Sequence, residues 1–132
     1  MSCWRTYQCD TLKNVNKNWI IEALKELGVH VDQNKKIVRG SYENRNAQVD
    51  GVFSYDGKNT DLGIIFNGKN NKVEIIGDFW GSGLDSMTFV DDLARQYLKI
   101  QTENQLRMAG YIVQDVTTDA NGDIVMEAVA YA

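Results

Sequence analysis

The sequence predicts an α+β fold of two layers, in which a mainly antiparallel sheet of about six to seven strands carries two helices on one face. Two segments place apolar residues at spacings of three and four, as amphipathic helices do, and the segments around them read as short strands. Turn pairs such as Asn121-Gly122 separate several of these strands. Because each amphipathic helix needs an apolar surface to cover, the order β-α-ββββ-α-ββ places both helices on the same side of one sheet.

The length and composition fit one domain that spans residues 1–132. A chain of 132 residues falls in the size range of a single core. Its 43% hydrophobic and 24% charged residues are close to globular averages. No run of 18 apolar residues occurs, and the first ten residues lack the apolar centre of a secretion signal, so we expect a cytoplasmic protein without a membrane segment.

The first half contains the clearest helix. We expect a strand over 4–12 and then a helix over 15–27, which Asn14 caps and Gly28 ends. Short strands follow at 29–32 and 36–39, and a polar loop covers 40–46.

Three hairpin strands and a long helix form the next part of the prediction. Residues 49–56 alternate apolar with polar side chains, and the turn pairs Asp56-Gly57 and Asn67-Gly68 separate this strand from strands at 62–66 and 72–80. A helix is expected over 86–109 with Ser86 as its cap, and strands at 111–116 and 124–131 close the chain as a hairpin.

Several short motifs occur in an order and at spacings that together resemble a known family. They are Ala23-Leu-Lys-Glu-Leu-Gly28, Val38-Arg-Gly40, Gly77-Asp-Phe-Trp-Gly81, Arg95-Gln-Tyr97, Gly110-Tyr111 and Asn121-Gly-Asp-Ile124. The chain resembles the hypothetical chloroplast reading frame thirty-five family, an uncharacterised domain of plastid genomes, cyanobacteria and other bacteria. The resemblance implies a small protein without an established activity or catalytic residues, an association with ATPases of the AAA type in some bacteria, and a plastid stroma location if a plastid encodes the chain.

The charge is distributed unevenly along the chain. Residues 1–72 hold 11 basic and 8 acidic side chains, whereas residues 73–132 hold 3 basic and 10 acidic ones. The basic residues are scattered among acids, so nucleic-acid binding is not expected. The acidic C-terminal half either serves solubility alone or faces a basic protein partner.

Two sets of residues are candidates for contact with a protein partner. Asp78 and Trp80 should point away from Phe79, which would place a polar and aromatic patch on the open sheet face; the alternative is that Trp80 covers an edge. The second set is the acids of the last hairpin, Asp115, Asp119, Asp123 and Glu127. The last strand, as an edge, is also suited to pairing with a second copy.

The turn between the last hairpin strand and the long helix has two interpretations. Gly77, Gly81, Ser82 and Gly83 stand where backbone amides can hold a phosphate, which makes a small-ligand or nucleotide site the alternative function. No Lys-Ser/Thr pair follows, and nearby carboxylates would repel an anion. The other interpretation is a structural loop.

No catalytic or metal-binding constellation is recognisable. His30 is the only histidine, Cys3 and Cys9 are expected to be free thiols, and no cofactor or metal is expected. The Asp119–Asp123 segment suits a hairpin turn better than calcium. Arg39, Tyr42 and Arg45 form a loop that is either hydrated or pairs with an acidic group. The sequence therefore favours a non-enzymatic accessory or adaptor protein.

Overall fold

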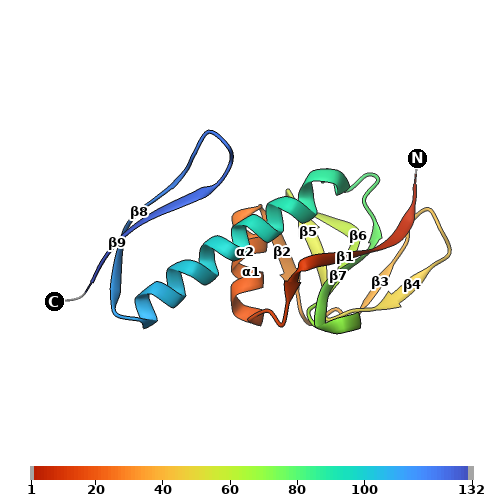
Figure 1. Ribbon diagram of the computed structural model, residues 1–132. Helices are drawn as coiled ribbons and strands as arrows, with labels where there is room; N and C mark the ends of the chain where they lie inside the picture. Colours follow the sequence, from red (N-terminus) through yellow and green to blue (C-terminus); the bar gives the residue numbers. More distant parts are fainter. Residues whose placement is uncertain (1, 131–132) are drawn as a thin grey trace.

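A five-stranded antiparallel sheet forms the centre of the computed structural model, which describes residues 2–130 (Figure 1). Its strands, in spatial order, are β1 (Trp4–Lys13), β7 (Lys72–Asp78), β6 (Lys58–Ile65), β5 (Gly51–Tyr55) and β2 (Val29–Asp32). β5, β6 and β7 are the three hairpin strands expected from the sequence, and a short 3-10 turn, η1 (Lys69–Asn71), joins the last two.

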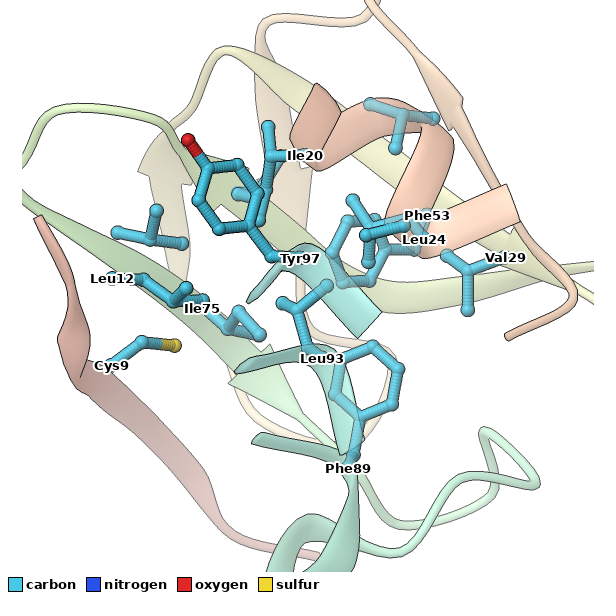
Figure 2. Packing of buried hydrophobic residues seen from close by; sticks show 14 of the residues in the cluster. Cys9, Leu12, Ile20, Leu24, Val29, Phe53, Ile75, Phe89, Leu93 and Tyr97 are labelled. Atoms are coloured by element: carbon cyan, nitrogen blue, oxygen red, sulfur yellow. The ribbon is translucent and has the colours of Figure 1, made fainter. Parts of the chain in front are cut away.

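Both helices, α1 (Lys17–Glu26) and α2 (Ser86–Met108), cover the same face of this sheet and pack against each other. In Figure 2, Phe89, Leu93 and Tyr97 of α2 lie among residues of the sheet and α1. Ile75 and Leu24 there are 0% exposed. The predicted α+β class and the placement of two helices on one face are confirmed.

The helix starts differ slightly from the predicted ones. α1 is capped by Asn16, whose side chain accepts the N–H groups of Asn18 and Trp19, and not by Asn14. Asn14 instead adopts a left-handed conformation, with φ at 52°, and its N–H donates to the carbonyl of Asn71. Likewise, Asp85 and not Ser86 caps α2. In both places the residue that caps is the one whose carboxamide or carboxylate oxygen reaches the amides of the first turn.

The other face of the sheet is partly covered, which corrects the expectation of an open face. A second small sheet, β3 (Ile37–Arg39) with β4 (Asn46–Gln48), contacts β5, β6 and β7. Val38, Val49 and Ile76 are at most 9% exposed, yet they lie outside the core beneath the helices. The short β3–β4 ribbon is therefore a lid over a separate apolar cluster, because its side chains bury against the back of the sheet.

Gly77 in β7 is required by a close backbone approach. Its φ of 136° is a conformation that L side chains rarely adopt, and a Cβ there would collide with the carbonyl oxygen of Asp61 on β6. The backbone geometry alone therefore explains why residue 77 is a glycine, and no bound ligand is needed to explain it.

The last hairpin lies apart from the sheet. β8 (Tyr111–Thr118) and β9 (Ile124–Ala130) form a third sheet beyond the far end of α2, which they contact through β8 (Figure 1). The predicted strand extended to Tyr131, which lies outside the described residues. Within residues 2–130, the strands are thus divided among one five-stranded and two two-stranded sheets.

Candidate functional site

The described residues do not assemble a catalytic or metal centre. No group of three or more His, Cys, Asp or Glu side chains in residues 2–130 is placed to hold a metal ion. His30 is exposed on β2. No helix in this part of the chain has both the length and the apolar character needed to cross a membrane.

The two cysteines are free, and they differ in environment. Cys3 is half-buried, whereas Cys9 is 1% exposed in the main core. Burial, with smaller contributions from the carboxylates of Asp10 and Glu74, raises the pKa of the Cys9 thiol to about 12. Since the thiolate is the reactive form, Cys9 is a packing residue and not a nucleophile.

Asp78 is buried at the end of β7, where its carboxylate fixes the backbone. The residue is 3% exposed, and its Oδ1 accepts the N–H groups of Cys3 and Trp80, each at 3.0 Å. Asp78 therefore contributes no surface to the patch expected from the sequence. The carboxylate instead holds two backbone segments in place, one at Cys3 and one at Trp80. Their N–H groups in turn stabilise the buried charge.

Trp80 emerges next to this anchor and is 47% exposed. Its ring meets that of Tyr42 edge to face, with centroids 4.6 Å apart. Tyr42, which is 62% exposed, belongs to the loop that joins β3 to β4. The lid over the back of the sheet thus brings a second exposed aromatic ring to Trp80.

The loop that carries Tyr42 is itself fixed to the sheet. The carboxylate of Glu43 accepts the N–H of Trp4 at 3.0 Å, and Asp61 accepts both the N–H and the hydroxyl of Ser41 at 2.7 and 2.9 Å. Arg39 and Arg45 flank this loop and are exposed. We call Arg39, Tyr42, Arg45 and Trp80 the aromatic end.

The Ser82 side chain and several backbone groups of the Gly77–Gly83 turn are engaged within the turn. Gly81 and Gly83 have positive φ, and the Ser82 hydroxyl donates to the carbonyl of Phe79 at 2.6 Å. Asp85 Oδ1 accepts the N–H of Met87 at 2.9 Å, so the start of α2 has a carboxylate of its own. An anion would compete with that carboxylate, and the turn therefore serves chain reversal better than phosphate binding.

The four hairpin acids occupy two places on β8–β9. Asp115 and Glu127 are directly opposite each other across the two strands. Asp119 lies in the turn, where its Oδ1 accepts the N–H groups of Asn121 and Asp123 at 2.9 Å. Asp119 and Asp123 are thus residues of a hairpin turn. Asp123, just before β9, lines the same cleft as Asp91 and Arg95 of α2, so the turn of the hairpin lies beside this helix.

Two features of these surfaces were not predicted. Arg39, Tyr42 and Arg45 were predicted as a loop that is either hydrated or pairs with an acidic group, but nothing in the linear sequence indicates that Tyr42 packs on Trp80. The second feature is a set of exposed apolar side chains in the last hairpin: Ile112, Val125 and Val129 are 45%, 45% and 42% exposed. In the sequence, the two strands of the last hairpin carry apolar residues on both faces. This pattern could have indicated that one of the two faces is left without a cover.

The fold and its surfaces define a small α+β protein with an exposed aromatic pair and an exposed hairpin. The family model described as "Protein of unknown function (DUF1257)" matches residues 23–126, which is most of the chain. The protein therefore belongs to this family, and the resemblance to an uncharacterised domain is confirmed. No curated protein and no solved structure matches the chain.

Proposed function

We propose that this protein is a non-enzymatic accessory or adaptor protein that binds a protein partner through the aromatic end. The observation that carries the proposal is the exposed edge-to-face pair of Trp80 and Tyr42, which is held by hydrogen bonds on both sides. Two large rings left half-exposed on a fixed backbone gain apolar burial only when another molecule covers them.

The residue types of the aromatic end are those that dominate binding energy at protein interfaces. Trp, Tyr and Arg are enriched among residues whose truncation costs about 2 kcal/mol or more. Asp78 supports this surface from within, because its carboxylate holds the N–H of Trp80. Since the backbone is already fixed, little conformational entropy is lost when a partner binds.

The charge around the aromatic end indicates the chemistry of the partner. Residues 36–48, which form β3, β4 and their connections, carry three basic side chains and one acidic side chain. The acid, Glu43, is already engaged with the backbone of Trp4. An acidic segment of another protein therefore complements this surface. An ATPase of the AAA type is the candidate that the family resemblance implies.

The acids of the β8–β9 hairpin, which follows α2 in the chain, form a second proposed contact surface. This surface has four acidic residues and no basic residue: Asp115, Asp119, Asp123 and Glu127. It fits a basic surface of a partner, and it would repel the acidic segment that is proposed to bind the aromatic end. A small-ligand function at the Gly77–Gly83 turn is not favoured, because the Ser82 hydroxyl already has a partner there and the Asp85 carboxylate caps the start of α2.

The test places a photoreactive phenylalanine analogue at position 42 in the source cells, with the same analogue at exposed Met87 as control. A partner crosslinked through an acidic segment from position 42 and not from position 87 is expected. The purified partner should then bind Trp80→Ala at least about 30-fold more weakly than wild type, which corresponds to about 2 kcal/mol.

Two outcomes would contradict the proposal. One is a partner that binds wild type, Trp80→Ala and Tyr42→Ala equally. The other is a crosslinked segment that is basic or purely apolar, since the arginines would then have no counterpart. Binding should also weaken with rising salt, because exposed charge pairs are screened.

A further inference from the structure

The β8–β9 hairpin exposes apolar side chains that no part of the described chain covers. None of residues 101–130 is buried. Ile112 and Val129 are directly opposite each other, and Val125 lies on the same face of β9. We call Ile112, Val125 and Val129 the outer row. The opposite face, which includes Ile124 and Met126, is half-buried beside α2. Strands apolar on both faces are typical of sheets covered on both faces, and a lone hairpin is marginal in water.

The total surface of the chain agrees with a missing cover. The chain exposes 8237 Å² for a mass of 14.9 kDa, whereas a compact monomer of that mass exposes about 7,000 Å². The excess of about 1,200 Å² is of the size that each partner loses in a stable dimer, where about 800 Å² per partner is standard.

A complementary surface is present on the same chain. A cleft of about 930 Å³ lies between the end of β1, α2 and the start of β9. Its apolar lining includes Leu12, Leu98 and Leu106. Its charged lining residues are three basic ones, Lys13, Arg95 and Lys99, and two acidic ones, Asp91 and Asp123. Leu98 is 55% exposed, although it is in the middle of α2.

The only charged side chains of the hairpin are acidic ones, whereas basic residues outnumber acidic ones by three to two in the lining of the cleft. Asp115 and Glu127 are opposite each other on the face of the outer row, and like charges in such a pair destabilise a hairpin. Residues 110–132 contain four acids and no basic residue, whereas residues 1–109 contain 14 of each. The hairpin thus cannot neutralise this pair by itself, and two hairpins placed face to face would repel each other.

We propose that the protein forms a two-fold dimer in which the outer row of each hairpin packs on the α2 cleft of the other copy. In this arrangement Asp115 and Glu127 of one chain face Arg95 and Lys99 of the other. The contact is isologous, so each chain supplies one hairpin and one cleft, and the assembly closes as a pair. The aromatic ends take no part in the contact, and a dimer presents two of them to partners.

The first experiment measures the mass of the purified protein by light scattering and sedimentation. Wild type should have twice the monomer mass of 14.9 kDa. The double variant Ile112→Lys, Val129→Glu should be a monomer, since its new charges attract each other across the strands but cannot pack on the cleft. Met87→Lys, at an exposed apolar position near the start of α2, should remain a dimer. A monomeric wild type at near-millimolar concentration, or a dimeric double variant, would overturn the proposal.

A charge exchange tests which surfaces meet. Asp115→Lys with Glu127→Lys in one preparation, and Arg95→Glu with Lys99→Glu in another, should each be monomeric, because like charges then meet at both contacts. Mixed in equal amounts, the two preparations should form a mixed dimer, because both contacts pair opposite charges again. A mixture that stays monomeric would refute the packing of hairpin on cleft.

Both experiments use the purified protein alone, with Tyr42 and Trp80 unchanged. Failure of the dimer therefore leaves the adaptor function standing. Conversely, Trp80→Ala should remain a dimer even though it loses the protein partner.

Discussion

The body of the molecule (residues 2–100) and the β8–β9 hairpin both contain strands rich in apolar residues, but they differ in how much apolar surface they bury. In the body, β6 and β7 have two helices on one side and the β3–β4 lid on the other, and Leu62, Ile64 and Ile75 are 0% exposed. In the hairpin no residue is buried. An apolar strand therefore becomes core only where a second layer covers it.

The largest effect that separates the two regions should come from truncating one leucine in α2. Leu93→Ala removes a side chain that is 0% exposed and should lower the free energy of unfolding by about 3 to 5 kcal/mol through lost burial and a cavity. Leu98→Ala, one helical turn further and 55% exposed, should cost less than about 1 kcal/mol. Urea denaturation of both variants in dilute solution measures the difference; equal losses would show that the helix is buried on both sides.

The Cys9 thiol makes the stability of the body depend on pH. Its pKa is raised to about 12, so the folded state holds the proton more tightly than the unfolded state, where the value is near 9.0. This stabilisation is complete below pH 9 and is lost as pH rises towards 12. By about pH 10.5 the free energy of unfolding should fall by about 2 kcal/mol more in wild type than in Cys9→Ala.

The two proteins are compared by how steeply the free energy of unfolding changes with pH. The absolute stability is not compared, because Cys9→Ala also loses some packing. Denaturation curves for both proteins across this pH range should diverge steadily. Parallel curves would mean that the thiol is ionised as easily in the fold as in the unfolded chain.

Asp78 joins the body to the aromatic end, so its removal should affect both. Asp78→Ala leaves the N–H groups of Cys3 and Trp80 without their acceptor and should cost about 2 kcal/mol in stability. Asp78→Asn keeps an oxygen at that place and should cost about half as much. Trp80 fluorescence should show a more mobile ring in the alanine variant; an unchanged ring in both would mean that the carboxylate does not position it.

The sequence was sufficient where structure is local. Spacings of three and four placed α1 and α2 on one face, and turn pairs placed the β5–β6 and β8–β9 hairpins. The lid and the aromatic pair depend on contacts between segments far apart in the chain, such as Tyr42 with Trp80, and short strands of three residues carry little periodicity. The alternation of side chains could not show that the Asp78 carboxylate is buried and accepts the N–H groups of Cys3 and Trp80.

The smallest predicted effect concerns the hairpin alone. Asp119→Ala removes the acceptor of two turn amides and should cost about 1 kcal/mol, with Asn121→Ala as a control whose side chain makes no hydrogen bond within residues 2–130. Because the hairpin shares no buried residue with the body, hydrogen exchange in dilute solution should speed up in β8 and β9 only, while the global unfolding midpoint stays unchanged. A fall in the global midpoint as large as that of Asp78→Ala would mean that hairpin and body unfold as one unit, and the contrast between the two regions would then lie in exposure and not in stability.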